Sequence, residues 1–154
     1  MPTRKIRAGR AGLGRRGTDV SIAGRHPPLG RRTVEQAVRT VLEGEGREVS
    51  ISVTFVGRDR MRRLNAAWKR KDRPTDVLAF SLPAPAGDLA GDVYVCRAVA
   101  VDHAAALAIS AREELLRLVI HGTLHVLGYD HPDGVRRTRS VMWRRQERYL
   151  ACVV

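Results

Sequence analysis

Residues 110–128, SAREELLRLVIHGTLHVLG, decide the fold. Ser110 followed by Glu113 is a capping-box pattern, which predicts the start of a helix. We expect this helix to run to about Leu127 and to end at Gly128, a favoured residue for closing a helix. Apolar residues wrap most of its circumference, so we expect it to lie buried at the centre of the domain. They are Leu115, Leu116, Leu118, Val119, Ile120, Leu124 and Leu127.

Strands and helices alternate along the rest of the chain. An apolar stripe predicts a helix that begins with a capping box at Thr33 and Gln36 and stops at Gly44. This interleaving is typical of the α+β or α/β class. We predict the α+β class, with a mixed sheet of about four strands packed with about five helices. Strands are predicted over residues 19–22, 49–55, 77–82 and 92–96, and further helices over 61–68, 98–108 and 135–150.

Length and composition favour one domain. The chain has 154 residues, of which 44% are apolar, which is enough for a buried core. Residues 1–17 are rich in arginine and glycine and predict a flexible basic tail, which leaves 18–154 as a single domain. Apolar stretches are broken well before the roughly 20 positions that a membrane span needs. The two cysteines, Cys96 and Cys152, give no sign of a disulfide, so we expect a cytoplasmic protein.

Positive charge gathers in three segments. The net charge is +12, with +6 in residues 1–17, +6 in 58–73 and +5 in 136–154, whereas residues 74–135 carry −5. Clustered lysine and arginine favour a polyanionic partner, because each neutralised phosphate releases a counterion and adds to affinity. Solvated basic surfaces are the alternative, so charge alone favours nucleic acid only slightly.

Three of the five histidines fall within eleven residues, at His121, His125 and His131. The first two are four apart and share one helix face, at about 6 Å from each other. Gly128 can adopt a positive φ and turn the chain back, so that His131 meets the same ion. Three imidazoles without a thiolate suit one Zn²⁺ per chain, and three ligands rather than four leave a position for water, as in catalytic sites. The alternative is a set of core or capping histidines.

The same spacing matches the long zinc-protease signature H-E-x-x-H-x-x-G-x-x-H. Gly122 stands where that signature has its glutamate general base. Losing such a base typically costs ~10²–10⁴-fold in rate. The pattern therefore predicts the metal site of that class without its peptide-cleaving apparatus.

Residues 121–131, HGTLHVLGYDH, also resemble the signature of the YbeY endoribonucleases. Leu64-Asn65 followed by residues 72–80, DRPTDVLAF, resembles a second block of that family, and Gly91-Asp92-Val93 resembles its G-D-[IV] strand start. The matched blocks cover about residues 20–150. One position departs from the pattern: the family usually has arginine after the aromatic at Trp68, and here Lys69 stands there with Arg70 beside it. Lysine binds phosphate as a point charge, whereas arginine can form two parallel hydrogen bonds to it.

The resemblance implies a metal-dependent hydrolase that cleaves single-stranded RNA in ribosomal RNA maturation and ribosome quality control. Ribosomal RNA and the small ribosomal subunit are then its expected partners. Lys69 and Arg70 are candidates for holding the phosphate and offsetting charge in the transition state. Asp130 could accept a ring N–H from a ligand histidine, and a simple turn role is about as plausible. We expect Trp68 in the core rather than stacked on a base, from its spacing to Met61 and Leu64.

Two other functions remain open at the level of sequence. One is a zinc hydrolase of another substrate, a peptide or a small molecule, against which the missing glutamate and the charge of +12 both speak. The other is a non-catalytic ribosome-assembly factor whose metal serves folding.

Overall fold

The computed structural model describes residues 19–24, 28–83 and 89–154, so the tail expected at 1–17 lies outside the described residues. Five α-helices and one 3₁₀ helix accompany four strands in these ranges, which confirms the α+β class. In chain order the elements are β1 (Val20–Ala23), α1 (Arg31–Gly44), β2 (Ser50–Val56), α2 (Arg58–Lys69), β3 (Val77–Pro83), β4 (Leu89–Cys96), α3 (Arg97–Leu107), α4 (Ala111–Val126), a 3₁₀ helix (Gly134–Arg139) and α5 (Val141–Val153).

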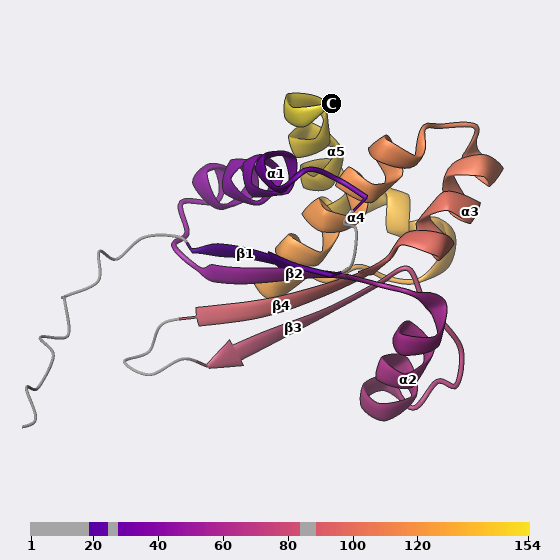
Figure 1. The fold of residues 1–154 in the computed structure, drawn as a ribbon. Helices are drawn as coiled ribbons and strands as arrows, with labels where there is room; N and C mark the ends of the chain where they lie inside the picture. The colour runs from indigo at the N-terminus through magenta and orange to yellow at the C-terminus, as the bar shows by residue number, and fades with distance from the viewer. Residues whose placement is uncertain (1–18, 25–27, 84–88) are drawn as a thin grey trace, which may run out of the picture.

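The strands form one mixed sheet in the order β1-β2-β4-β3 (Figure 1). β1, β2 and β4 run parallel, and β3 pairs antiparallel with β4. In this register Val53 of β2 and Ala79 of β3 lie on either side of Val93 of β4. Because side chains alternate between the faces of a sheet, these three residues share one face, where Val53 and Val93 belong to the main core and Ala79 packs against it.

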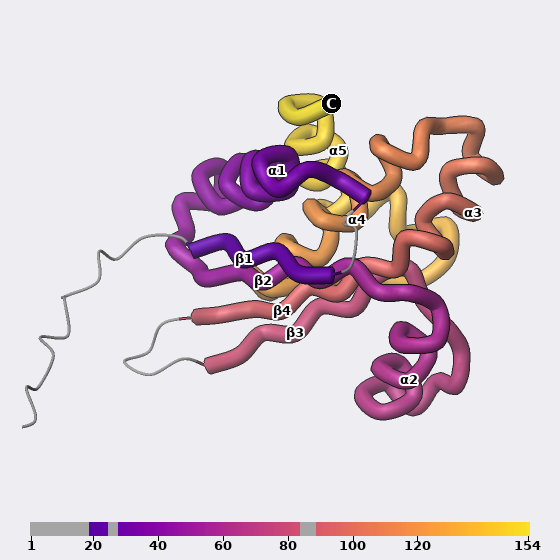
Figure 2. Tube along the Cα trace, viewed as in Figure 1, coloured from indigo at the N-terminus to yellow at the C-terminus, as the bar shows by residue number. Residues whose placement is uncertain are grey.

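Helices cover the two faces of the sheet unequally. α1, α4 and α5 lie over one face, and α2 lies on the other side (Figure 2). α4 is the central element, because it contacts α1, α3, α5, β3 and β4. A smaller cluster on the opposite face joins Met61 of α2 to Leu78 and Cys96 of the sheet. No helix of the described ranges is long and apolar enough to cross a membrane.

Two glycines let α4 lie directly on β4. A Cβ atom at Gly91 would come within 2.3 Å of a methyl group of Val126, and one at Gly122 within 2.4 Å of a methyl group of Val93. Position 122 therefore faces the sheet. This contact explains why glycine stands where the zinc proteases carry glutamate, since a longer side chain would collide with β4.

Helix ends agree with the sequence-based expectations in one case and differ in another. Ser110 caps α4, since its hydroxyl accepts a hydrogen bond from the Glu113 N–H at 3.1 Å, as predicted. The capping box predicted at Thr33 was wrong. α1 begins at Arg31 with Gly30 as its cap, and the Thr33 N–H already donates to the Gly30 carbonyl at 3.0 Å. Thr33 lies inside the first turn, where backbone bonding leaves no capping role.

The last predicted helix was too long at its start, and Trp68 was misplaced. Residues 135–139 belong to the 3₁₀ helix, and α5 begins at Val141 after the cap Ser140. Trp68 is 67% exposed and rests against the ring of Phe80, with ring centroids 5.4 Å apart. α2 buries Met61 and Asn65 but ends at the rim of its small cluster, so its last turn has no core to enter.

We expect Gly122→Ala to lower the free energy of unfolding. Forcing a methyl group against Val93 costs ~1–3 kcal/mol by overpacking, which exceeds the gain of up to ~1 kcal/mol from the helix propensity of alanine. Urea denaturation of Gly122→Ala, Val93→Ala and the double variant measures the coupling between the two positions. Gly122→Ala should lower the free energy of unfolding by less in the Val93→Ala background than in the wild type. Equal costs in both backgrounds would contradict the contact.

Candidate metal centre

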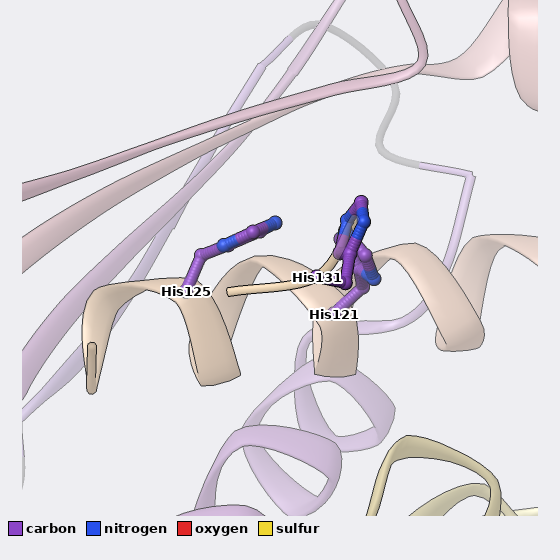
Figure 3. Close-up of side chains that lie close together, drawn as sticks. All are labelled: His121, His125 and His131. Carbon is purple, nitrogen blue, oxygen red and sulfur yellow. The ribbon is translucent and has the colours of Figure 1, made fainter. Parts of the chain in front are cut away.

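Three histidines converge where α4 ends (Figure 3). His121 and His125 lie one turn apart on α4, and His131 follows the turn after the helix. Gly128 has a φ of +97°, in the left-handed region that favours glycine, and this conformation helps to bring His131 back over the helix. One ligand nitrogen from each ring lies within 4.8 Å of the other two. The structure thus brings together the three residues that the spacing predicts.

The buried imidazole of His121 is held by α5. Its Nδ1 lies 2.6 Å from Oε1 of Gln146. Nε2 of the same amide donates to a carboxylate oxygen of Glu147 at 3.1 Å, which turns the amide oxygen toward His121. An amide oxygen only accepts, so Nδ1 carries the proton and donates it, and Nε2 keeps its lone pair for a metal.

Backbone carbonyls orient the other two rings in the same way. Nδ1 of His125 lies 2.9 Å from the Tyr129 carbonyl oxygen, and Nδ1 of His131 lies 3.1 Å from that of Pro132. Both carbonyls are acceptors, so both Nδ1 atoms donate, and in the neutral form of each ring Nε2 is the nitrogen left to bind a metal. Such a hydrogen bond on the far ring nitrogen is the usual support of a metal-ligating histidine.

The spacing of the donors fits zinc. Nε2 of His121 lies 3.3 Å from Nε2 of His131. Two nitrogen ligands at about 2.0–2.1 Å from a tetrahedral zinc lie roughly 3.3 Å apart. Three neutral imidazoles also match the ligand preference of this metal. The residues present can therefore hold one divalent ion without rearrangement of this pair.

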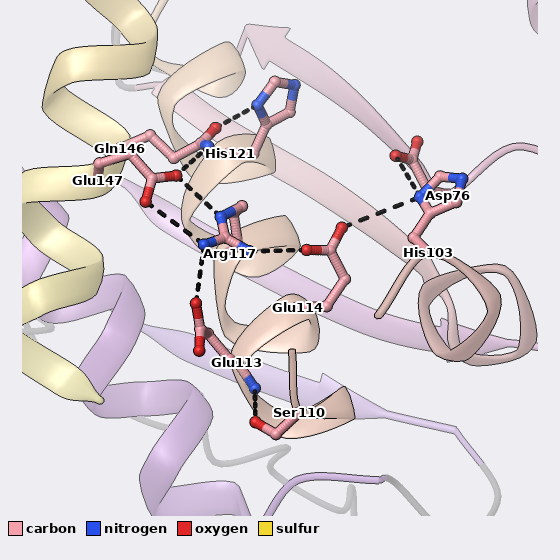
Figure 4. A network of polar contacts seen from close by, with 9 residues as sticks. All are labelled: Asp76, His103, Ser110, Glu113, Glu114, Arg117, His121, Gln146 and Glu147. Atoms are coloured by element: carbon pink, nitrogen blue, oxygen red, sulfur yellow. Dashed lines mark hydrogen bonds and ion pairs between the residues drawn. The ribbon is translucent and has the colours of Figure 1, made fainter. Parts of the chain in front are cut away.

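Arg117 anchors the support of His121 (Figure 4). Its guanidinium donates to Glu147 of α5 at 2.8 Å and to Glu114 on its own helix at 2.8 Å, and its side chain is only 15% exposed. Burial opposes this charge, but the hydrogen bonds that the guanidinium donates to the carboxylates outweigh burial and raise the pKa of Arg117. The contacts run from α4 through Arg117 to Glu147, then to Gln146 and back to His121, which makes a closed ring between the two helices.

A second network fixes the carbonyl that holds His125. The Tyr129 hydroxyl donates to Glu45 at 2.6 Å, and Glu45 also accepts from Tyr149 at 2.6 Å and from Arg145 at 2.8 Å. Burial by itself would raise the pKa of Glu45, but these three hydrogen bonds outweigh it and lower the pKa. Glu45 therefore stays charged and ties the turn after α4 to α1 and α5.

Burial keeps the helical histidines neutral. It lowers the pKa of His121 to about 3, although the hydrogen bond that Nδ1 donates to Gln146 acts to raise this pKa; the nearby His125 and Arg137 lower it further. Burial also lowers the pKa of His125. A neutral imidazole is the form that binds a metal, so both ligands are ready for one at neutral pH.

The other predicted site residues lie apart from the three rings. The Asp130 carboxylate accepts from the backbone N–H of His131 at 2.8 Å, which is the turn role, and among the described residues it bonds to none of the three imidazoles. Lys69 ends α2 and Arg70 caps it in the left-handed conformation, with a φ of +56°. Both are exposed, and no described contact joins either one to the histidines.

Gln146 was missed at the level of sequence. It lies on the buried stripe of α5, four residues after Met142 and four before Leu150. A polar residue on an otherwise apolar stripe needs a buried partner, and this was the available signal. The partner itself lies 25 residues away and follows only from the packing of α5 on α4.

Comparisons with known proteins agree on one family. A family model described as endoribonuclease YbeY matches residues 26–153. The chain is 34% identical to an endoribonuclease YbeY of Halorhodospira halophila over 138 residues, covering 86% of this chain and 88% of that one. It is 33% identical to that of Thermotoga petrophila over 117 residues, 76% of each. A solution structure of a Thermotoga maritima protein superposes with a TM-score of 0.59 at 30% identity, covering 87% of this chain and 88% of that one.

Removing the acceptor on α5 should weaken metal binding. We expect Gln146→Leu to lower zinc affinity by ~10–100-fold, because the His121 ring loses the hydrogen bond that fixes its tautomer and orientation. Competition with a chromophoric chelator measures the affinity. Gln146→Glu keeps an acceptor in place and should hold the affinity near that of the wild type. Unchanged affinity in Gln146→Leu would show that the contact does not position the ligand.

The metal-free protein should lose stability in acid. The unfolded chain protonates its histidines below about pH 6.5, whereas His121 in the fold stays neutral down to about pH 3. Between these values the unfolded state binds the extra proton, so the free energy of unfolding falls as the pH falls. Urea denaturation from pH 7 to pH 4 measures this slope. The slope should be smaller in His121→Asn, and identical slopes would contradict a buried neutral imidazole.

Proposed function

The chain belongs to the YbeY endoribonuclease family, and from this premise we propose that it is a zinc-dependent endoribonuclease that cleaves single-stranded RNA in ribosomal RNA maturation and ribosome quality control. The family match spans most of the chain, including the histidines and both helices that support them. The observation that carries the proposal is the set of three inward Nε2 atoms, each with its Nδ1 held by an oxygen acceptor.

We assign one Zn²⁺ to each chain, bound by His121, His125 and His131. Three nitrogen donors favour zinc over the hard cations, which prefer oxygen ligands. When bound, zinc supplies Lewis-acid chemistry at a phosphodiester. The absence of a fourth protein ligand among the described residues supports a catalytic role for the ion rather than a structural one.

The chain's own residues would hold and orient the reacting groups. The hydrogen bonds donated by the Nδ1 atoms fix the direction of the three imidazoles, so that no ligand has to reorganise as charge develops. Lys69 and Arg70 are assigned to the RNA backbone. Both are exposed, and among the described residues neither pairs with a carboxylate, whereas Arg58 and Arg62 of the same helix do. Free cations of this kind can take up phosphate.

Ribosomal RNA and the small ribosomal subunit are the proposed partners, and the cytoplasm is the proposed compartment. The net charge of +12 favours association with a polyanion, in keeping with an RNA substrate. Asp130 is assigned to positioning: its bond to the His131 N–H shapes the turn that presents this ligand.

Loss of one ligand should abolish cleavage. We expect His125→Ala to lose stoichiometric zinc and to cut a single-stranded RNA oligonucleotide at least ~100-fold more slowly than the wild type, because the open metal site is lost. Metal analysis of the purified proteins and a gel assay with the same RNA, single-stranded and in duplex, provide the measurements. Arg112→Ala, an exposed change on the same helix, is the matched control and should retain both properties. Equal cleavage by His125→Ala and the wild type would overturn the proposal, and so would equal cleavage of the duplex.

A further inference from the structure

A cavity of about 540 Å³ opens beside His121, between α3, α4 and the start of α5. This volume lies in the range of sites that bind small molecules, and it could admit a nucleoside. Leu107, Ile109, Leu118 and Trp143 contribute apolar surface to its lining, beside polar and charged side chains. Since His121 belongs to both the cavity and the metal centre, a ligand in the cavity lies next to the metal centre.

The cavity lining includes a cation, Arg137, that pairs with no carboxylate of the described residues. Arg137, from the 3₁₀ helix, has its Nε atom buried, and this atom finds no hydrogen-bond partner among the described residues. Its guanidinium carbon lies 6.0 Å from the centre of the Trp143 ring. Arg145 also has a buried Nε without a partner, but its guanidinium pairs with Glu45, and that of Arg117 pairs with three carboxylates. An unpaired guanidinium beside a metal centre suits a phosphate, which it can bind through two parallel hydrogen bonds.

Two carboxylates in the lining offer hydrogen-bond acceptors. Asp76 and Glu114 line the cavity, and the Nδ1 atom of His103 lies 3.7 Å from Oδ2 of Asp76 and 3.9 Å from Oε1 of Glu114 (Figure 4). Both separations exceed hydrogen-bond length, so these two oxygens keep lone pairs for a ligand. Carboxylate oxygens accept hydrogen bonds from amino groups, and adenine, cytosine and guanine carry an amino group that uracil lacks.

We propose that this cavity is the binding site for the nucleoside next to the scissile phosphate. Arg137 binds the phosphate, Trp143 lies against the base, and Asp76 with Glu114 accepts hydrogen bonds from the amino group of the base. The inference rests on the proposed ribonuclease function for its choice of ligand. It adds a preference that this function does not contain: adenine, cytosine or guanine rather than uracil at one position beside the cleavage site.

Binding of mononucleotides to the full-length protein tests the site without any cleavage, because these ligands contain no internal phosphodiester. Calorimetric titration with AMP, CMP, GMP and UMP should give at least ~10-fold weaker binding of UMP, since the carboxylates meet no amino group. In a Trp68→Phe background Trp143 is the sole tryptophan, and AMP should quench its fluorescence. Equal affinity for UMP and AMP, or no change in fluorescence, would overturn the proposal.

Matched variants separate the role of Arg137 from the role of the carboxylates. Arg137→Ala should weaken AMP at least ~10-fold while leaving adenosine unchanged, because only the phosphate contact is lost. Arg136→Ala removes the same charge from the exposed neighbour and should leave both ligands unchanged. Asp76→Asn should narrow the difference between AMP and UMP. Equal effects of Arg137→Ala and Arg136→Ala would overturn the phosphate contact, and an unchanged preference in Asp76→Asn would overturn the role of the carboxylate.

The subsite and the proposed function can fail separately. Nucleotide binding with the expected preference, in a protein that does not cut RNA, would contradict only the ribonuclease proposal. Cleavage that depends on His125, in a protein that binds no mononucleotide, would overturn only the subsite.

Discussion

The metal centre depends on the close contact between α4 and β4. Because Gly91 and Gly122 lack side chains, the helix lies directly on the sheet with Val126 and Val93 filling the space between them. Successive residues of a helix are rotated by about 100°, so His121 and His125, each one position before a sheet-facing residue, point to the side of this contact. The two imidazoles therefore neither pack against the sheet nor extend fully into solvent. A glutamate at position 122 would lift the helix off β4 and turn the imidazoles away from the support on α5.

That support comes from parts of the chain far from the motif. Gln146 reaches His121 from α5, and Glu45 at the end of α1 holds the tyrosine whose carbonyl orients His125. A three-histidine pattern on an isolated helix would place the rings near one another but would leave their tautomers open. Packing of α1 and α5 on α4 supports the Nδ1 hydrogen bonds of His121 and His125, and so helps to present their Nε2 atoms to a metal.

The sequence predicts what local geometry controls and misses what packing controls. His121, His125 and the turn at Gly128 follow from helix periodicity and from the freedom of glycine, and the cap at Ser110 follows from its spacing to Glu113. Thr33 carries the same capping pattern, yet α1 starts earlier because Gly30 already accepts the first backbone bonds. Trp68 has core-like spacing, but only its neighbours in the fold decide that no core lies opposite it. Gln146 has no local signature beyond a polar residue on an apolar stripe, since its partner lies 25 positions away.

Charge counted by segment gives a misleading view of the surface offered to RNA. The segment 74–135 is acidic in sequence, with a charge of −5, yet two of its carboxylates, Glu113 and Glu114, pair with Arg117. Glu45 likewise neutralises Arg145. These acids stabilise the packing of the helices and so offer little repulsion to a substrate. A cation matters for phosphate binding when it has no such partner, which distinguishes Arg137 from Arg117 although both line the same cavity. The pairing of each charge in the fold, more than the net charge of its segment, therefore determines where an anion can bind.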